Sequence, residues 1–326
     1  QIFSPILSLE KRTKKTSTTN NVKPEPRNNI QTTVSMGCCV ARKDMGKHTL
    51  NRHKVHVQKE EKIEAKFREG DLFLFGDNSR GQIGDESKIG RFDTPLKSGF
   101  GWARHPIRKF SVGYDHVCVT TSEGELFGWG SNSNSQLGSR SSSTIDRPCK
   151  LKPGMYVKDV ACGHGFTLVI DKFGKVFGVG ANSRGQLGNG KAQDRTSEFV
   201  RVCGIEKAYK VCAGKAHTVV LQETEHSMYV FGDNSSNQLG ISSDDDMLVQ
   251  AVRVDNLSPW DVACGDTFTV IVSSERNVKI AGTIGSKSFP DKFKSIDEKK
   301  DCKNVSAGSL HVLVCYFFFQ FSLSLF

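Results

Sequence analysis

The chain has 326 residues, of which 37% are hydrophobic, so it can form one large or two ordinary globular domains with a substantial core. Its formal net charge is +10, but residues 1–69 hold 15 of the 45 Lys and Arg and 7 of the 35 Asp and Glu, and so carry +8 of it. The remainder is nearly neutral. This distribution excludes a broad basic surface on the body of the protein and argues against specific nucleic-acid binding.

The first segment, residues 1–69, is expected to be a disordered basic leader, because residues 11–35 are mainly Thr, Asn, Lys and Ser with almost nothing to bury. At the start of the chain the charges follow the apolar stretch, which is the reverse of a secretory signal. A reducing compartment therefore suits the ten cysteines better than an oxidising one. We expect a cytoplasmic location, with membrane association as a variant of it and the nucleus as the alternative.

The stretch "MGCCVARK" at residues 36–43 matches a dual-acylation pattern, in which a second acyl chain makes anchoring stable. The candidate lipidation residues are Gly37, Cys38 and Cys39. Ala41 stands where the motif has Ser or Thr, which argues against it. Contact with a membrane surface through residues 36–59 and a plain unstructured leader both stay open.

Two phrases then recur with a period of about fifty residues. The first is a short apolar run, a glycine and a loop such as "NSRGQLG", and its glycines are Gly76, Gly130, Gly180 and Gly232. The second has the form GxxH or GxxF after another apolar run, and its glycines are Gly113, Gly163, Gly214, Gly265 and Gly308. The phrases divide the chain into five units, the last with a degraded first phrase: 70–123, 124–173, 174–226, 227–276 and 277–315.

Each unit is typical of strands rather than helices. Runs such as "GELFGWG" and "GKVFGVG" are short, rich in aromatic and β-branched residues, and preceded by a strand and a turn, so each unit predicts a small antiparallel sheet of about four strands. Such a sheet cannot bury both faces alone, and a ring of them is a β-propeller. We expect the glycines to serve positive φ angles and close backbone approach. The loop asparagines are predicted to form Asx turns with the backbone two residues on, and they are Asn78, Asn132, Asn182 and Asn234.

The two phrases together strongly resemble the regulator of chromosome condensation repeat, whose family builds seven-bladed propellers with about fifty residues per blade. The resemblance covers residues 70–315. Seven blades would need about 350 residues, so we expect an all-β, incomplete propeller with about five of the seven blades. The chain is then a fragment, a misassembled product or an open ring. Residues 316–326 are expected to be a non-native apolar tail.

No catalytic constellation and no metal-ligand spacing is evident in the sequence, so we expect a non-enzymatic binding module without a cofactor or metal. Cys162, Cys212 and Cys264 are interpreted as buried structural thiols. The corner loops of the second phrase are the expected partner surface, and the candidate residues are Asp115, His116, His164, His217, Asp266 and His311. The alternative for the histidines at the fourth position is a hydrogen bond to the backbone within their own blade.

The resemblance implies more about partners. In the founding member of the family, acidic and histidine residues of such loops hold the GTPase Ran and drive nucleotide release, and Asp115 and Asp266 match those positions in kind. The phrasing looks more like the retinitis pigmentosa GTPase regulator branch, which works with small GTPases of membrane traffic and cilia. The first functional hypothesis is therefore a small-GTPase regulator, acting as an exchange factor or an effector scaffold. The alternatives are a chromatin-associated propeller and the substrate-binding propeller of a larger ubiquitin ligase or kinase.

Overall fold

The computed structural model describes residues 32–35, 38–42, 72–87, 89–138, 142–296, 301–316 and 321–324. Nearly all regular structure in these ranges is antiparallel strand, and the helices are two single 3₁₀ turns, η1 (Trp102–Arg104) and η2 (Thr224–His226). None of the helices found in these ranges is long and apolar enough to cross a bilayer. The prediction of an all-β chain is confirmed.

The described strands form six sheets, in each of which successive strands are hydrogen-bonded neighbours. Sheet 1 contains β1 (Thr32–Ser35), β2 (Cys38–Arg42), β3 (Leu72–Asp77) and β4 (Arg91–Lys97). Sheet 2 contains β5 (Ile107–Val112), β6 (His116–Thr121), β7 (Leu126–Ser131) and β8 (Thr144–Lys150). Sheet 3 contains β9 (Val157–Cys162), β10 (Phe166–Asp171), β11 (Val176–Asn182) and β12 (Gln193–Arg201).

The other three sheets follow the same order of strands. Sheet 4 contains β13 (Ala208–Ala213), β14 (His217–Gln222), β15 (Met228–Asp233) and β16 (Met247–Val254). Sheet 5 contains β17 (Asp261–Cys264), β18 (Phe268–Val272), β19 (Val278–Ile284) and β20 (Lys287–Ser288), with β21 (Lys294–Ser295) also paired to β19. Sheet 6 contains β22 (Cys302–Ala307), β23 (Val312–Tyr316) and β24 (Phe321–Ser324).

The sequence repeat is offset from the sheets by half a unit. A second-phrase glycine directly follows the first strand of a sheet, whereas a first-phrase glycine lies in the third strand. The five second phrases therefore begin sheets 2 to 6, and the first phrase at Gly76 belongs to β3 of sheet 1. Five units of sequence thus generate six sheets.

Two expectations at the ends of the chain need correction. Residues 1–69 were expected to be disordered, but Thr32–Ser35 and Cys38–Arg42 form the two inner strands of sheet 1. The apolar tail at 316–326 was expected to lie outside the fold, but Phe321–Ser324 pairs with β23. The reason is the same at both places, because strand edges left open by β3 and β23 offer backbone hydrogen bonds that do not depend on side-chain type. The other residues of the leader lie outside the described ranges, and so does Gly37.

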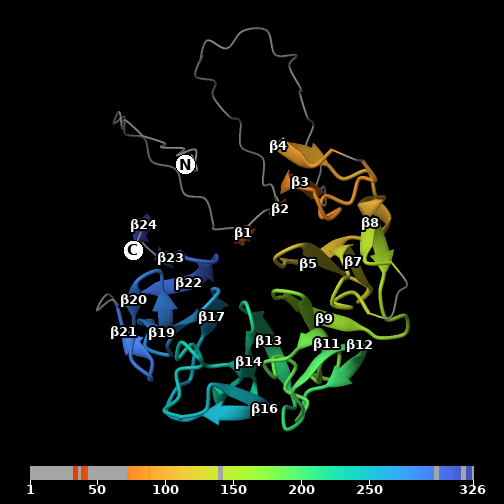
Figure 1. The fold of residues 1–326 in the computed structure, drawn as a ribbon. Coiled ribbons are helices and arrows are strands. Elements are labelled where there is room, and N and C mark those ends of the chain that lie inside the picture. Colours follow the sequence, from red (N-terminus) through yellow and green to blue (C-terminus); the bar gives the residue numbers. More distant parts are fainter. Residues whose placement is uncertain are drawn as a thin grey trace, which may run out of the picture.

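The six sheets lie around a common centre, as the propeller prediction requires (Figure 1). The first strands of sheets 2 to 6 contact one another in order, β5 with β9, β9 with β13, β13 with β17 and β17 with β22, and β1 contacts both β5 and β22. The glycines that follow them come close together: a Cβ atom on Gly113 would lie 2.6 Å from the carbonyl oxygen of Gly163, and one on Gly163 would lie 2.7 Å from that of Gly214. Only glycine allows the inner corners of the sheets to approach this closely.

The first-phrase glycines serve the other purpose that the sequence suggested. Gly130 and Gly180 have φ angles of 101° and 109°, a conformation that other residues rarely adopt, and Gly282 in the degraded phrase "KIAGTIG" has 103°. Each of these three glycines pairs with the first residue of the preceding strand. The degraded fifth unit therefore keeps the backbone geometry of the intact ones.

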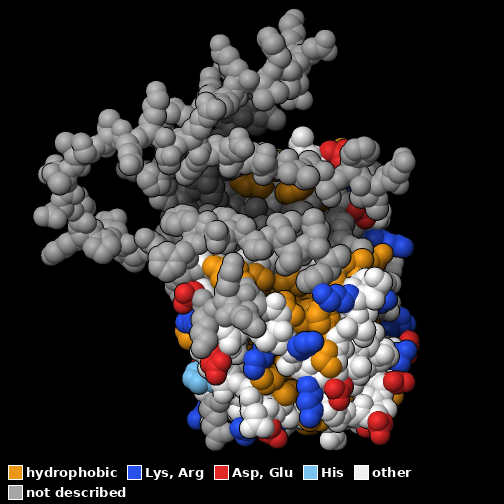
Figure 2. Space-filling view, turned by 90° about the vertical axis from the view of Figure 1, so that its left-hand side faces the viewer, with side chains coloured by type: hydrophobic (Ala, Val, Ile, Leu, Met, Phe, Trp, Pro, Cys, Tyr) orange, Lys and Arg blue, Asp and Glu red, His pale blue; other side chains and the backbone are white. Residues whose placement is uncertain are grey.

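The hydrophobic core lies between neighbouring sheets. The middle strands β6 and β10 are buried along their whole length, and the leucine of each "QLG", such as Leu137 and Leu187, is at most 1% exposed. Figure 2 shows one outer side of the ring, where hydrophobic side chains are interspersed with Lys, Arg, Asp and Glu. This mixture of charges agrees with the nearly neutral body of the sequence.

Candidate functional site

A central channel runs between the first strands of sheets 2 to 6 and has a volume of about 1080 Å³. Its wall is formed by β5, β9, β13, β17 and β22, and the loops after these strands surround one mouth. Positions along the wall repeat from strand to strand, because every first strand runs in the same direction toward its glycine. Side chains at equivalent positions therefore form rings.

One such ring alternates lysine and aspartate. The Lys109 Nζ atom lies 2.6 Å from Asp159 Oδ1, and Lys210 pairs in the same way with Asp261. Each aspartate also accepts a backbone hydrogen bond from the next sheet: Val211 N to Asp159 Oδ2 at 3.2 Å, and Val305 N to Asp261 Oδ2 at 3.0 Å. Each carboxylate thus joins three consecutive sheets, and its burial is compensated by a cation and backbone donors.

Two buried histidines clamp neighbouring sheets together. His116 Nε2 lies 2.9 Å from Thr167 Oγ1 in sheet 3, and Thr167 donates its hydroxyl proton to the carbonyl oxygen of Gln136 at 2.7 Å. Since a threonine hydroxyl has one proton, it accepts from His116, which must carry a proton on Nε2. His217, Thr269 and the carbonyl of Gln238 repeat this arrangement between sheets 4 and 5.

These features recur every second sheet. Lys109 and Lys210 are 101 residues apart, and so are His116 and His217, while Asp159 and Asp261 are 102 apart. Between sheets 3 and 4, and between sheets 5 and 6, a phenylalanine occupies the place of the histidine: Phe166 and Phe268, both fully buried. Polar and apolar junctions therefore alternate around the channel.

The two histidine clamps differ in charge. Burial lowers the pKa of His217 to about 4. Burial also acts to lower the pKa of His116, but the negative charges of Cys162 and Asp115 outweigh it and raise the pKa to about 9. Asp115 Oδ1 lies 3.9 Å from His116 Nδ1, whereas the position before His217 is Ala216. At neutral pH His116 is therefore protonated and His217 is neutral.

The residues that follow the central glycines surround the mouth of the channel, and we call them the mouth ring. Its members are Tyr114, His164, Lys215, Asp266 and Ser309. Tyr114 is 51% exposed and its ring stacks on His164 with centroids 4.2 Å apart. The Asp266 carboxylate accepts a hydrogen bond from the Ser309 hydroxyl, and backbone bonds such as Tyr114 N to Gly163 O hold adjacent loops together.

The electrostatics of the mouth follow from its partial burial. Burial is the largest influence on His164 and lowers its pKa, so this imidazole is neutral at neutral pH. Burial acts to raise the pKa of Asp115, but the hydrogen bond and charge of His116 lower it overall. Asp115 also accepts a hydrogen bond from Gln136 Nε2 at 3.3 Å. The mouth therefore presents a fixed carboxylate, a cation at Lys215 and an aromatic pair.

The six candidate partner residues divide into two groups. His164 and His311 are exposed, and Asp115 and Asp266 are half-buried in the loops after β5 and β17. His116 and His217 are fully buried, which corrects their assignment to the partner surface. The alternative of a backbone hydrogen bond within the same blade is also wrong for these two side chains, because each bonds a threonine hydroxyl of the next sheet.

Sequence reasoning missed Tyr114, Lys215 and Ser309, which share the mouth with His164 and Asp266. The signal was available, since all five directly follow a second-phrase glycine. The asparagine prediction also needs correction: Asn132 Oδ1 accepts from Leu137 N, five residues on, at 2.9 Å, and Asn182 does the same with Leu187 at 3.0 Å. The Asn side chain thus spans the whole loop instead of forming an Asx turn.

Three side chains of metal-ligating type come together between sheets 2 and 3. His116, Cys118 and Cys162 each place one potential ligand atom within 4.8 Å of the others, and all three are buried. They come from β6 and β9, so no local spacing in the sequence could have revealed them. His116 Nε2 already has Thr167 as its hydrogen-bond partner, and an ion bound to that nitrogen would have to displace it.

The arrangement of the loops matches a known repeat. The family model "Regulator of chromosome condensation (RCC1) repeat" matches residues 123–170 and 174–221, and a second model of the same description matches residues 107–136 and 157–186. The chain carries RCC1 repeats. The matches at 123–170 and 174–221 run from the third strand of one sheet to the second strand of the next, which is the half-unit offset described above.

Two curated relatives are similar to the chain over much of its length. Human X-linked retinitis pigmentosa GTPase regulator is 31% identical over 214 residues, which cover 63% of this chain and 20% of that protein. The human probable E3 ubiquitin-protein ligase HERC6 is 30% identical over 259 residues, which cover 73% of this chain and 25% of that protein. The chain therefore spans about a fifth to a quarter of the length of these relatives.

A solved structure supports the propeller fold of the RCC1 repeats. Yeast RCC1 (Prp20), solved with Kap60 bound, has a TM-score of 0.68 at 18% identity, covering 88% of this chain and 68% of that one. A second structure of Prp20p, from Saccharomyces cerevisiae, accompanies a description of its binding to Gsp1p and histones. The likeness to an RCC1 propeller confirms the fold class predicted from the two phrases.

Proposed function

We propose that this RCC1-repeat chain is a non-enzymatic binding module that regulates a small GTPase through the mouth ring and Asp115. The observation that carries the proposal is Tyr114, a large aromatic side chain 51% exposed and stacked on His164 on the loop side of the channel. Interfaces concentrate binding energy in aromatic anchors surrounded by polar groups. The relative named a GTPase regulator supports a GTPase as the partner.

The charges around Tyr114 suit a partner with both signs of charge on its surface. Asp266 lines the channel in the loop next to that of the exposed Lys215, and Asp115 lies half-buried beside Tyr114 in the loop after β5. Both carboxylates are oriented before a partner arrives, since Gln136 holds Asp115 and Ser309 holds Asp266. Orientation in advance lowers the entropy cost of association.

The nucleotide dependence of binding distinguishes the two modes of regulation. An exchange factor binds the nucleotide-free GTPase more tightly than the loaded form, and by thermodynamic linkage it weakens the hold of that GTPase on nucleotide. An effector scaffold binds the GTP-loaded form more tightly. Neither mode requires a catalytic group on this chain.

The test is to measure affinities of the purified full chain for a panel of small GTPases in nucleotide-free, GDP-bound and GTP-analogue-bound states. We expect one GTPase to bind with a preference for one state. Tyr114→Ala, and the double variant Asp115→Ala with Asp266→Ala, should each weaken that binding by about tenfold or more. Release of a fluorescent GDP analogue then separates exchange from scaffolding.

The matched control is Phe173→Ala. Phe173 is 66% exposed in the turn between β10 and β11, at the opposite end of the strands from the mouth ring. Its replacement should leave GTPase affinity unchanged, and circular dichroism should show all variants folded. Equal loss in the Phe173 variant, or binding that ignores the nucleotide state, would contradict the proposal.

A second candidate function is substrate recognition within a larger ubiquitin ligase, favoured by the similarity to HERC6 over 73% of this chain. In this function the same mouth ring would bind a substrate protein, and the binding would not depend on guanine nucleotide. Its test is the full-length transcript, which must then encode a ligase catalytic region in the same reading frame. A transcript without such a region would leave only the first function.

A further inference from the structure

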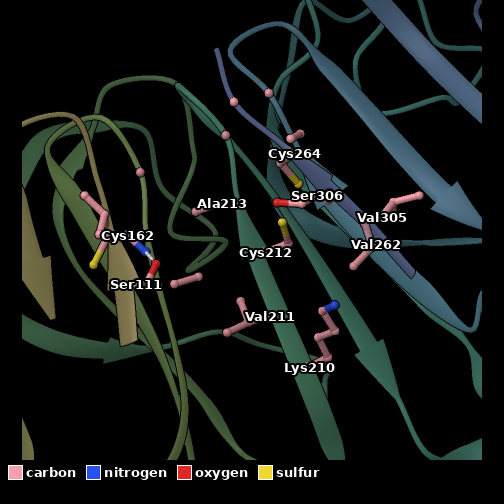
Figure 3. Close-up of a pocket in the computed structure, with 18 of the residues that line it drawn as sticks. Ser111, Cys162, Lys210, Val211, Cys212, Ala213, Val262, Cys264, Val305 and Ser306 are labelled. Carbon is pink, nitrogen blue, oxygen red and sulfur yellow. Dashed lines mark hydrogen bonds between the residues drawn. The ribbon is translucent and has the colours of Figure 1, made fainter. Parts of the chain in front are cut away.

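The wall of the central channel carries two thiols from neighbouring sheets. Cys212 is near the end of β13 and half-buried, and Cys264 ends β17 and is 9% exposed. Both line the cavity of about 1080 Å³. Figure 3 shows their sulfur atoms facing each other beside Ser306. The sequence offered no reason to pair them, because they are 52 residues apart.

The two thiols differ in what surrounds them. The Cys212 sulfur accepts hydrogen bonds from both the thiol and the backbone N–H of Cys264, and the Lys210 ammonium lies nearby, so the pKa of Cys212 is lowered. Burial raises the pKa of Cys264, and its hydrogen bond to Cys212 acts in the same direction. Cys212 is therefore the better nucleophile and Cys264 the thiol that stays protonated.

We propose that Cys212 and Cys264 are a modification site, a dithiol that hydrogen peroxide oxidises to a disulfide joining sheets 4 and 5. The Cys212 thiolate attacks one peroxide oxygen, the O–O bond breaks, and water leaves after proton uptake, giving Cys212 sulfenic acid. The Cys264 sulfur then attacks the Cys212 sulfur, the S–O bond breaks, and a second water leaves. Two thiols and one peroxide thus become one disulfide and two waters.

A second cysteine pair in the same molecule serves as an internal comparison. Cys118 and Cys162 are also hydrogen-bonded across a junction, between sheets 2 and 3, but they are 0% and 5% exposed. Cys162 lines the same channel but is only 5% exposed, and Cys118 is fully buried and does not line it, so access of peroxide limits oxidation there more than at the half-buried Cys212. We expect the Cys212–Cys264 disulfide to form on the order of tenfold faster than any bond involving Cys118.

The molecule also supplies a conservative variant. Ser111 occupies in sheet 2 the position of Cys212 in sheet 4, and its hydroxyl oxygen accepts a hydrogen bond from Cys162 N at 2.9 Å. Cys212→Ser therefore reproduces a contact already present in this fold and should leave the folded state intact. It removes the nucleophile without removing the acceptor for the Cys264 backbone N–H.

The experiment treats the reduced, purified full chain with hydrogen peroxide, alkylates the remaining thiols, and maps peptides by mass spectrometry. A peptide linking Cys212 to Cys264 should appear first, with a loss of 2 Da from the intact mass and a rise in the midpoint of thermal unfolding. Both effects should vanish in Cys212→Ser and in Cys264→Ala, with the circular dichroism spectra unchanged.

Three outcomes would overturn the proposal. One is that Cys212 stays open to alkylation after the other thiols have reacted. Another is that the first disulfide involves different residues, such as the exposed Cys203 of two copies. The third is that Cys212→Ser, while folded, still gives the rise in unfolding temperature. The test needs no GTPase, so its result is independent of the proposed function.

Discussion

The junction between sheets 2 and 3 and the junction between sheets 4 and 5 share one design and differ in charge. Each has a lysine–aspartate pair at one end of the first strands and a His–Thr–carbonyl clamp near the other. Yet His116 has a pKa of about 9 and His217 one of about 4. The same residue in the same hydrogen-bond geometry is cationic in one junction and neutral in the other.

The cause lies at positions where the units differ in residue type. Asp115 precedes His116, where Ala216 precedes His217. Burial acts to raise the pKa of Cys162, but its hydrogen bond to Cys118 and the charge of His116 lower it, and Cys162 in turn raises the pKa of His116. Burial and the hydrogen bond to Cys212 raise the pKa of the counterpart Cys264, which does not act on His217. The repeat therefore determines the hydrogen bonds, while residues that vary between units determine the charge state.

The largest expected effect tests whether the two junctions are mechanically equivalent. Asp159→Ala and Asp261→Ala should each destabilise the protein by about 3 kcal/mol, because each leaves backbone donors of two sheets and a lysine without the carboxylate. Urea unfolding followed by circular dichroism measures this. The control is Asp93→Ala, whose carboxylate pairs with Arg91 in a fully exposed position and should leave the midpoint unchanged. If Asp159→Ala were destabilised and Asp261→Ala were not, the two junctions would not be mechanically equivalent.

The next effect is acid sensitivity located in one junction only. The pKa of His217 is about 4 when folded and 6.5 when unfolded, so its contribution is complete above pH 6.5 and is lost as pH falls from 6.5 to about 4. The loss amounts to about 3 kcal/mol. The urea midpoint of the wild-type protein should therefore fall as the pH is lowered from 7 to 4. The midpoint of His217→Phe should fall less steeply. This variant introduces the residue type found at Phe166 and Phe268 in the apolar junctions.

His116→Phe is the matched variant in the other junction. Because the folded pKa of His116 is raised, its stabilising contribution is fully present below pH 6.5 and is lost only as pH rises through about 9. The His116 variant should therefore keep the acid sensitivity of the wild type between pH 6.5 and pH 4. If His116→Phe reduced the acid sensitivity to the same extent as His217→Phe, the assigned charge states would be wrong.

The sequence predicted the radial sheets well and the junctions poorly, for a physical reason. Strand type, hairpin order and the need for glycine are local properties, and Gly130 and Gly163 fulfil them as expected. Whether a GxxH histidine is buried depends on the neighbouring sheet, since the partner of His116 is Thr167, 51 residues on. Comparison of alternate units, about 101 residues apart, would have revealed that Lys109 and Lys210 occupy equivalent positions, and that His116 and His217 do so as well.

The mouth ring shows the same limit. His164 and Asp266 were predicted from their chemistry, but Tyr114 was not, because an aromatic residue next to a turn glycine is usually predicted to be buried in the core. Its exposure follows from the tight approach of Gly113 to Gly163, which leaves no space inside the corner for the next side chain. Of the residues that follow the central glycines, Tyr114, His164 and Lys215 are exposed, while Asp266 and Ser309 are half-buried. The position after each central glycine could therefore have been predicted to lie outside the core in all five units.

A smaller effect separates the charged clamp from the neutral one. Thr167→Val and Thr269→Val each remove a hydroxyl that joins a histidine to a carbonyl, and each should cost about 1–3 kcal/mol in urea unfolding. The loss at Thr167 should be the larger, because it leaves an imidazolium N–H without its acceptor. Thr218→Val is the reference, since Thr218 bonds the Gln186 carbonyl and faces no histidine, and it should cost least. The reverse order for Thr167 and Thr269 would contradict the charge assignment.

The smallest effect tests the cause of the difference directly. Ala216→Asp places a carboxylate beside His217, as Asp115 stands beside His116, and should raise the pKa of His217 above about 4 without bringing it to about 9. The rise should stay partial because the strongest influence that raises the pKa of His116 is Cys162, whereas its counterpart Cys264, whose own pKa is raised by burial, does not act on His217. The imidazole resonances of His217 in a pH titration by NMR measure the shift, and Ala216→Asn is the neutral control. A pKa of His217 that stays at its starting value in the aspartate variant would show that burial alone decides the charge of the clamp, and that the neighbour before the histidine is irrelevant to it.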